Sequence, residues 1–328
     1  MFRKLVSITF AAAICMFMSH IAAAGDKKEF SAPKTYRALE SKDSSELQRI
    51  LDKAVESTVA EFASKGFKPE NIAATLIDMR GNGSYPMASY RGEEMIYPAS
   101  VVKMFYMAAL EEWIAEGKIK VTGEIDRGLR DMIVDSSNEA TQYVLDVLTG
   151  TSSGAELPEK EFAKWAFKRN IVNRYYSMLG YRNINVNQKT FCEDAYGIEQ
   201  QYRNYKGENR NRLTTNATAR LLAEIVLGRM GDAEATRIMT DLMKRDPFAK
   251  TNDQDDQAHG FSGLALINKN LKDAKIWSKA GWTSQTRHDA AYIELADGRK
   301  FVIVVFTEKF ATERNVIPSV VSSIIDSL

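Results

Sequence analysis

The stretch YPASVVKMFYMAAL, residues 97–110, places Ser100 three positions before Lys103 at the start of a long apolar run. Because the run is apolar almost all round, it predicts a buried helix. Ser100 then has two readings, as the N-cap of that helix or as a nucleophile. The same Ser-x-x-Lys spacing recurs at residues 31–34, where a proline and polar neighbours favour a mobile leader. The spacing therefore needs support from other residues.

Residues 1–24 show the pattern of a secretory signal peptide, with two basic residues, a mostly apolar run over 5–18 and three alanines at 22–24. The apolar run is shorter than the ~20 residues that a membrane-spanning helix needs. We expect cleavage after Ala24, followed by a flexible leader over 25–44. The protein would then be exported, periplasmic or secreted, without a stable membrane span. An uncleaved N-terminal anchor is the alternative.

Charge and composition exclude several classes of function. The 328 residues include 44 basic and 43 acidic side chains, and loss of residues 1–24 would leave a net charge of −1. This balance gives no reason to expect a nucleic-acid partner. Only Cys192 follows residue 24, so no internal disulfide can form. The sequence lacks His-Glu-x-x-His, paired cysteines and a P-loop, and we expect neither a metal nor a cofactor.

Histidine is scarce, which limits the catalysts that the chain could contain. Of three histidines, His20 lies in the expected signal peptide, and no Gly-x-Ser-x-Gly motif occurs that would present a serine to a histidine base. If the protein is an enzyme, we expect its base to be a lysine or a carboxylate.

The order of elements predicts an α/β (α+β) fold over residues 45–328. Strands near both ends can join into one antiparallel sheet flanked by helices, leaving a helical lobe over about 100–270. Residues 180–212 read as a loop-rich stretch, and the acidic segment 251–260 as a solvated loop. Periodicity predicts helices over 44–67, 101–148, 159–179, 214–230, 232–245 and from about 312, and strands over 72–79, 85–92, 274–282, 289–296 and 300–308.

Three short motifs follow one another in the chain: SVVK at 100–103, SSN at 136–138 and KAG at 279–281. Together they resemble the Ser-x-x-Lys, Ser-Asp-Asn and Lys-Thr-Gly signatures of the penicillin-recognising serine hydrolases, and look closest to class A β-lactamases. The resemblance extends from about residue 45 to the C-terminus. It implies the β-lactamase/transpeptidase-like fold.

The chemistry explains why these residue types belong together. Residues three apart lie on one helix face, so Lys103 can place its amine beside Ser100 and accept the hydroxyl proton. The resemblance implies that Ser136 delivers a proton to the departing nitrogen and that Asn138 binds the substrate and Lys103. The alternative reading of residues 136–138 is a simple helix cap.

The third motif is expected to form the substrate-binding edge of a strand. In the family the residue at Lys279 points into the cleft, and Gly281 would let a substrate approach the strand closely. The backbone amides of Ser100 and Trp282 would hold the oxyanion. Arg287 or His288 could bind a substrate carboxylate, and the arginine fork suits that group better.

The sequence also departs from the family pattern. Ser137 replaces the aspartate, and Ala280, at a substrate-binding position, replaces a threonine or serine. The Glu-x-x-Leu-Asn run that supplies the deacylating glutamate of class A enzymes is absent. Glu193 is nearest to the expected place, with Glu199 next, although an exposed loop carboxylate is the alternative reading of both.

These features predict an exported, monomeric serine hydrolase that is acylated at Ser100 by β-lactams or peptide-like amides and then hydrolysed. Its partner would be a small molecule or a cell-wall peptide. Two alternatives remain open: a D,D-peptidase or esterase of the same superfamily, and a catalytically idle descendant that binds the cell wall or a partner.

Overall fold

A computed structural model describes residues 29–33, 36–191 and 194–328. The expected signal peptide and Glu193 therefore lie outside the described residues. The strands of the described chain form one sheet in the order β1-β3-β2-β7-β6-β5-β4. They are β1 Glu40–Asp43, β2 Ile72–Asp78, β3 Ser84–Tyr90, β4 Lys244–Arg245, β5 Lys275–Trp282, β6 Thr286–Glu294 and β7 Lys300–Glu308.

The helices surround this sheet and fill the segment between β3 and β5. They are α1 Ser45–Phe62, α2 Val102–Ala115, α3 Gly123–Ile133, α4 Asn138–Thr149, α5 Glu159–Arg169, α6 Ile171–Met178, α7 Gly197–Arg203, α8 Thr215–Val226, α9 Ala233–Met243, α10 Ser262–Asn268 and α11 Val316–Ser327. Short 3₁₀ turns occur at η1 Ala63–Lys65, η2 Pro69–Asn71 and η3 Ala99–Val101. None of the helices in the described part of the chain has the length and apolar content needed to span a bilayer.

The sheet joins the two ends of the folded chain, as the strand pattern predicted. β2 pairs antiparallel with β7, with Ile72 opposite Thr307, and β7 continues through β6 to β5. The mixed α/β class and the antiparallel pairing of the N- and C-terminal strands are thus confirmed. β1 was not predicted. It pairs parallel with β3, and its residues lie in the stretch that we expected to be a flexible leader.

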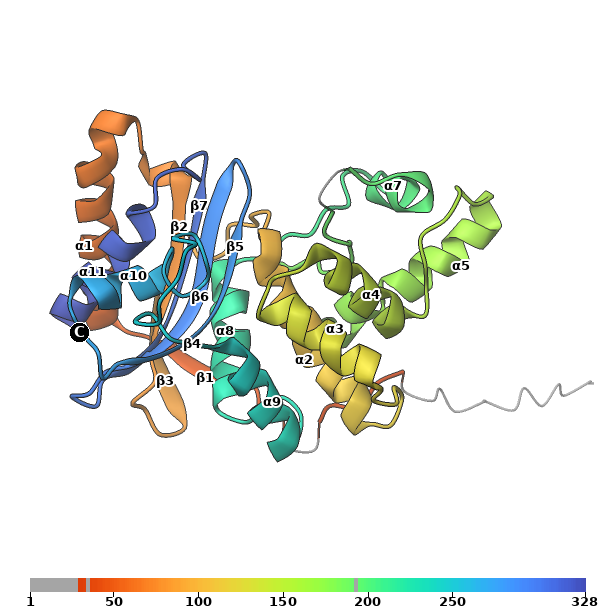
Figure 1. The fold of residues 1–328 in the computed structure, drawn as a ribbon, viewed down its shortest axis with the longest axis horizontal. Coiled ribbons are helices and arrows are strands. Elements are labelled where there is room, and N and C mark those ends of the chain that lie inside the picture. Colours follow the sequence, from red (N-terminus) through yellow and green to blue (C-terminus); the bar gives the residue numbers. More distant parts are fainter. Residues whose placement is uncertain (1–28, 34–35, 192–193) are drawn as a thin grey trace, which may run out of the picture. The chain divides into compact units, whose positions relative to one another are not determined.

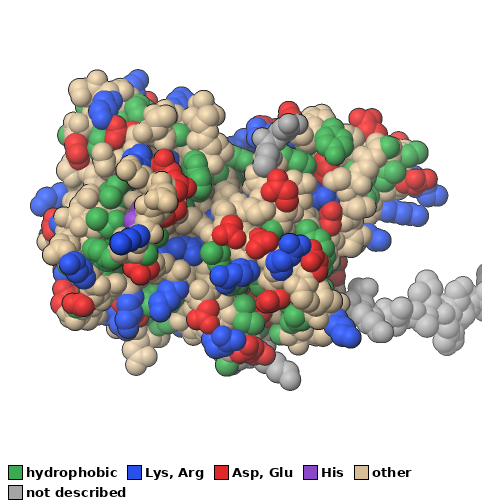
Figure 2. Space-filling model, viewed as in Figure 1, with side chains coloured by type: hydrophobic (Ala, Val, Ile, Leu, Met, Phe, Trp, Pro, Cys, Tyr) green, Lys and Arg blue, Asp and Glu red, His purple; other side chains and the backbone are tan. Residues whose placement is uncertain are grey.

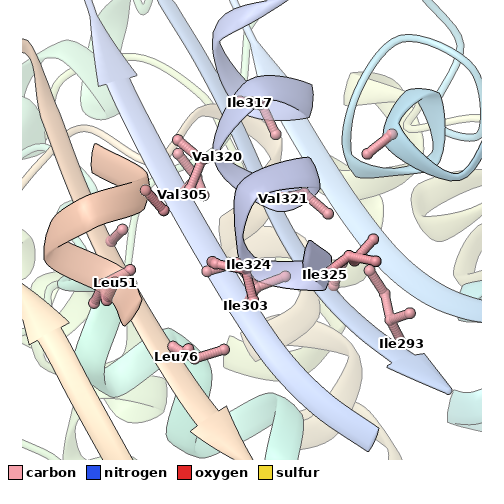
Figure 3. Close-up of a cluster of buried hydrophobic side chains, with 14 of the residues drawn as sticks. Leu51, Leu76, Ile293, Ile303, Val305, Ile317, Val320, Val321, Ile324 and Ile325 are labelled. Atoms are coloured by element: carbon pink, nitrogen blue, oxygen red, sulfur yellow. The ribbon is translucent and has the colours of Figure 1, made fainter. Parts of the chain in front are cut away.

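One face of the sheet is covered by α1, α10 and α11, and α8 packs on the other face (Figure 1). Helix α1 begins at the N-cap Ser44, whose Oγ accepts a hydrogen bond from the Leu47 backbone N–H. Its apolar stripe, including Leu51, meets Leu76 and Ile303 of the sheet and Ile324 of α11 in a buried cluster (Figure 3). This core holds β5 in place, and β5 carries one wall of the candidate site.

The other helices form the lobe that supplies the opposite wall. Acidic and basic side chains are interspersed on the face seen in Figure 2. Helix α2 is almost entirely buried between the sheet and the rest of the lobe, as its uniform apolar sequence predicted.

Candidate active site

Ser100 lies in the η3 turn that leads directly into α2, and it is half-buried. The preceding Ala99 has a φ of 47°, in the left-handed region that non-glycine residues rarely adopt. Such strain persists only where the surrounding structure holds it in place. The turn therefore presents Ser100 at the N-terminal end of a buried helix, where partial positive charge gathers.

Gly281 of β5 packs directly against this turn. A Cβ atom at position 281 would lie 2.7 Å from the backbone N of Ser100 and 2.8 Å from both Pro98 O and Val101 N. These are backbone atoms that cannot rotate away, so only glycine fits. The group that approaches Gly281 closely is thus the turn that carries Ser100, and the approach of a substrate to this strand edge stays a prediction.

Lys103 is fully buried one turn into the helix and joins Ser100's turn to the SSN motif. Its Nζ donates to Ser136 O at 2.5 Å, to Ser136 Oγ at 3.3 Å and to Asn138 Oδ1 at 3.0 Å. Ser136 has a φ of 58°, again in the left-handed region. Ser137 caps α4, with its Oγ accepting from Ala140 N at 3.1 Å. The helix-cap reading therefore holds for Ser137, whereas its two neighbours contact Lys103 and their roles in catalysis and substrate binding stay predictions.

Lys279 approaches the same hydroxyl from the sheet. Its Nζ donates to Ser136 Oγ at 3.0 Å and to Gln257 Oε1 at 2.7 Å. Complete burial, reinforced by the positive charges of Lys103 and Arg245, lowers the pKa of Lys279 well below its ordinary value. We call Ser100, Lys103, Ser136 and Lys279 the serine–lysine cluster.

Two residues beside this cluster escaped the sequence analysis. Gln257 lies in the acidic segment that we expected to be a solvated loop, yet it is buried. Its Nε2 donates to Ile133 O and Val134 O at 2.9 and 2.8 Å, while its Oε1 accepts from Lys279, so it ties the lobe to β5. Arg245 donates to Ser278 O at 3.0 Å, and burial lowers its pKa to about 10. No motif pointed to either residue, because their neighbours in space are distant in sequence.

The remaining residues of the β5 edge have different surroundings. The methyl group of Ala280 is buried in the hydrophobic cluster on the far side of the sheet from Lys279. Trp282, at the end of β5, is 40% exposed and its ring packs against Phe261. The exposed ring offers an apolar surface at the end of the strand that carries Lys279.

The expectation that Arg287 binds a substrate carboxylate does not fit its position. Its guanidinium is buried and donates to Asp255 Oδ1 and Gly260 O, each at 2.7 Å. The guanidinium of Arg287 is thus already hydrogen-bonded to other groups of the protein. His288 is also buried and neutral, with its pKa lowered to about 4 by burial, and its ring bridges Tyr97 O and Thr307 N.

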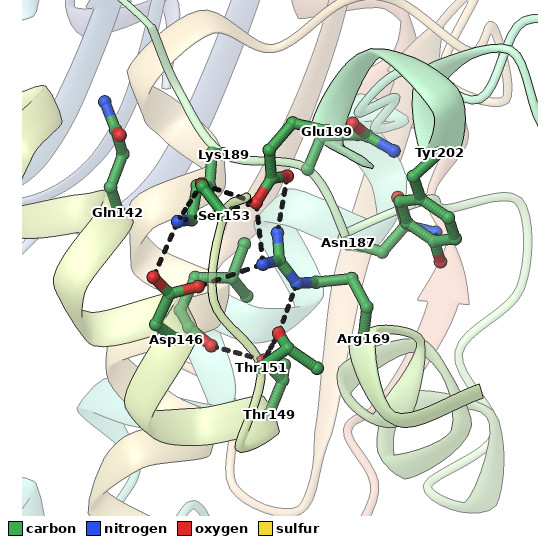
Figure 4. Close-up of polar contacts among 12 residues, drawn as sticks. Gln142, Asp146, Thr149, Thr151, Ser153, Arg169, Asn187, Lys189, Glu199 and Tyr202 are labelled. Atoms are coloured by element: carbon green, nitrogen blue, oxygen red, sulfur yellow. Dashed lines mark hydrogen bonds and ion pairs between the residues drawn. The ribbon is translucent and has the colours of Figure 1, made fainter. Parts of the chain in front are cut away.

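Glu199 does not face Ser100 either, and the reading of it as an exposed loop carboxylate is wrong. It is 1% exposed, and its two oxygens accept a bidentate pair of hydrogen bonds from Arg169 at 2.8 and 2.9 Å (Figure 4). Lys189 bonds Asp146 Oδ2 at 2.6 Å on the other side of the same group. We call Asp146, Arg169, Lys189 and Glu199 the loop anchor, because it ties the segment between α6 and α8 to α4 and α5.

Thr190 is the residue of this segment that is bound to α4 close to the serine–lysine cluster. Its carbonyl accepts from Nε2 of Gln142, one helical turn after Asn138, at 3.1 Å. Its own hydroxyl is buried and has no hydrogen-bond partner in the described part of the chain. The described contact between this segment and Gln142 of α4 is therefore made by the backbone of Thr190 and not by a carboxylate.

The arrangement suits nucleophilic attack by a serine. Two buried amines bracket the Ser136 hydroxyl, which can accept a proton from one amine and donate onward, and the half-buried Ser100 lies one helical turn before Lys103. No group of three or more His, Cys, Asp or Glu side chains that could hold a metal ion occurs within residues 29–33, 36–191 and 194–328.

Comparison with known families decides the relationship. The model of the β-lactamase enzyme family matches residues 124–327. The chain belongs to the β-lactamase enzyme family. The matched residues include Ser136 and Lys279, whereas Ser100 and Lys103 lie upstream of them. No curated protein matches the chain.

Solved β-lactamase structures share this fold. A β-lactamase from Sphaerobacter thermophilus is 17% identical with a TM-score of 0.58, covering 84% of this chain and 95% of its own. PBP-A is 15% identical with a TM-score of 0.57, covering 89% and 98%. A β-lactamase from Chitinophaga pinensis is 16% identical with a TM-score of 0.57, covering 83% and 97%. The resemblance to class A β-lactamases is confirmed, and at these identities the structures establish the fold alone.

Proposed function

We propose that the protein is a serine hydrolase whose Ser100 is acylated by β-lactams or peptide-like amides. The observation that carries the proposal is the position of Ser136 Oγ, 3.3 Å from Lys103 Nζ and 3.0 Å from Lys279 Nζ. A hydroxyl held between two amines can relay a proton without becoming charged itself.

In the proposed reaction, Lys103 in its neutral form removes the Ser100 proton while Oγ attacks the carbonyl carbon. The carbonyl oxygen becomes an oxyanion, bound by the backbone N–H groups of Ser100 and Trp282 as the family resemblance implies. The loss of one such donor typically costs about 3 to 4 kcal/mol of barrier. The carbon–nitrogen bond then breaks, and the proton passes from Lys103 through Ser136 to the leaving nitrogen. An ester at Ser100 and a free amine result.

Asn138 and Lys279 would bind the substrate, alongside the strand edge at Gly281 and Ala280. Lys279, where protonated, together with Arg245 supplies the positive charge that a substrate carboxylate needs. This role replaces the one expected of Arg287, whose guanidinium is already paired with Asp255.

We propose that release of the acyl group is slow. Glu199 is held by Arg169, and Thr190 occupies the contact with α4. Glu193 stays a prediction as the deacylating base. Slow release also favours the second candidate, a D,D-peptidase or esterase that forms the same acyl-enzyme. The structure of a PBP-A mutant of this fold is an acyl-enzyme complex with penicillin G.

The test is intact mass after incubation with benzylpenicillin and again after removal of free drug. We expect a one-to-one adduct that persists through the chase, absent in Ser100→Ala and unchanged in Ser31→Ala. Rapid loss of the adduct with release of opened drug would identify an efficient β-lactamase instead. A folded protein that never forms the adduct would favour the idle, binding-only descendant.

We also propose that the protein is exported and acts free of the membrane as a monomer. The support is the signal pattern of residues 1–24. N-terminal sequencing of exported protein should begin near Gly25, whereas an intact Met1 on exported protein would contradict cleavage.

A further inference from the structure

A concave region lies in the helical lobe, and none of the residues of the serine–lysine cluster lines it. It is a pocket of about 540 Å³ between α5, α6 and the segment that follows α7. Pockets that bind small molecules typically measure about 300–1,000 Å³. None of the residues assigned above to acylation lines it. Its polar lining is dominated by five asparagines, Asn170, Asn173, Asn185, Asn187 and Asn209, and we call it the amide pocket.

Hydrogen bonds among these side chains fix their amide planes. Asn173 Nδ2 donates to Asn170 Oδ1 and to Asn185 Oδ1, both at 2.7 Å, and Asn185 Nδ2 donates to Asn209 Oδ1 at 2.9 Å. Asn170 Nδ2, in contrast, donates no hydrogen bond to any described residue. The pocket therefore presents rigid amides with hydrogen-bonding capacity still available to a ligand.

Aromatic rings stand at the same pocket. Phe167 on α5 is 61% exposed although it is a large apolar side chain, and the Arg174 guanidinium lies 3.8 Å from its ring centroid. Tyr205 lines the pocket beside Tyr202, with the two rings stacked at 6.2 Å. An exposed ring beside oriented polar groups is a usual feature of binding surfaces.

The charges around the amide pocket argue against a metal ion or a phosphate. Glu208, the one carboxylate among the lining residues, is paired with Arg212 at 3.2 Å. Arg174 and Lys206 each lie over an aromatic ring, Phe167 and Tyr205 respectively. A matching ligand is largely uncharged, has many groups that both donate and accept hydrogen bonds, and has apolar C–H faces that can stack on a ring. Saccharides have this combination.

We propose that the amide pocket binds a saccharide. The inference does not depend on acylation of Ser100, because none of the residues assigned to acylation lines the pocket and the test is made in Ser100→Ala. Two sources would share this chemistry: an N-acetylated glycan, as in cell walls, and an unsubstituted glucan.

The experiment is isothermal titration of the full exported chain carrying Ser100→Ala with N-acetylglucosamine trimer and, separately, cellotriose. At least one should bind saturably with one site. Phe167→Ala should weaken that binding about 2- to 10-fold through loss of the stacking ring. Asn170→Asp should weaken it about 2- to 10-fold, because aspartate keeps the acceptor oxygen but not the donor.

The matched control is Phe248→Ala, which removes another exposed ring, 37% accessible, away from the pocket. Preference for the N-acetylated trimer would identify the cell-wall type of glycan, and preference for cellotriose the other source; either supports the site. Absence of saturable binding by both sugars would overturn the proposal. An equal loss of affinity in Phe248→Ala, or none in the two pocket variants, would also overturn it.

Discussion

Two buried lysines, in two regions of the molecule, differ in what offsets the free-energy cost of burying a positive charge. Lys189, in the loop anchor, bonds Asp146 Oδ2 at 2.6 Å and lies 3.5 Å from Glu199 Oε1. Lys279, in the serine–lysine cluster, bonds Ser136, Gln257 and its neighbour's carbonyl, and no described carboxylate lies within 4.0 Å of its Nζ. Burial penalises both charges, but only Lys189 has opposite charges in contact.

The difference separates a structural lysine from a chemically useful one. In the loop anchor, carboxylates lie against both Lys189 and Arg169, so it acts as a fixed set of ion pairs. Neutral partners leave the desolvation of Lys279 uncompensated, and the adjacent positive charges add to it, which is why its pKa falls. Amines with a lowered pKa are typical of catalytic sites, whereas sets of ion pairs such as the loop anchor stabilise a fold.

The largest effect is expected where the serine–lysine cluster loses its proposed proton acceptor. Lys103→Ala should slow acylation about 10²- to 10⁴-fold, the usual contribution of a general base. Lys103→Arg is the matched variant, because guanidinium keeps the charge but does not give up its proton. Rates of adduct formation are measured by mass spectrometry beside thermal melting. Acylation of Lys103→Arg at the wild-type rate would mean that the lysine is structural.

Removal of one ion-pair partner from the loop anchor should lower the stability of the protein. Arg169→Met leaves Glu199 buried without its bidentate partner, and we expect a loss of about 3–5 kcal/mol in the free energy of unfolding. Urea denaturation measures it. The control is Arg237→Met, which breaks the exposed pair with Glu234 and should have a much smaller effect. Equal effects of the two variants would contradict the structural role of the anchor.

Gly281→Ala tests the contact between β5 and the nucleophile's turn. The added methyl group would meet three backbone atoms at 2.7–2.8 Å, so we expect about 1–3 kcal/mol of destabilisation and slower acylation. Gly154→Ala is the control, since nothing lies within 4 Å of a Cβ there. Unchanged acylation in Gly281→Ala would show that the tight packing is not needed for the chemistry.

The smallest and most specific effect is expected from a substitution that gives Lys279 a carboxylate in contact, as Lys189 has. Gln257→Glu places a carboxylate against the amine, which favours the protonated form and raises the pKa of Lys279. The limb of the acylation pH profile that this amine controls should move to higher pH. Gln257→Met removes the same contacts without adding charge and should not move it upward. If the pH profile of folded Gln257→Glu does not shift, Lys279 is not the group whose titration controls that limb.

The sequence predicted the elements well where a segment's own pattern determines them. The mostly apolar run of β2, the strand pattern of β3, the apolar run of α2 and the three C-terminal strands are local signals, and the structure has all of these elements. β1 was missed because four polar residues, Glu40 to Asp43, become a strand only through pairing with β3.

The candidate site was predictable where motifs exist and not where its contacts are long-range. Ser100, Lys103, Ser136 and Lys279 come from motifs and lie together. The buried position of Glu199 depends on Arg169, thirty residues away, and nothing in the loop sequence signals that pairing. The same is true of Arg287, whose charge is met by Asp255 from another loop.

The sheet that joins both ends of the chain also sets when the site can exist. Lys279 and Ser136, which share a hydrogen bond, are 143 positions apart in the sequence, and β2 cannot pair with β7 until the last strand is available. Contacts between residues so far apart in the sequence make folding slow and cooperative. A chain still being synthesised would therefore lack the bond between Lys279 and Ser136, and the surroundings of Ser100 would be complete only when the C-terminal strands close the sheet.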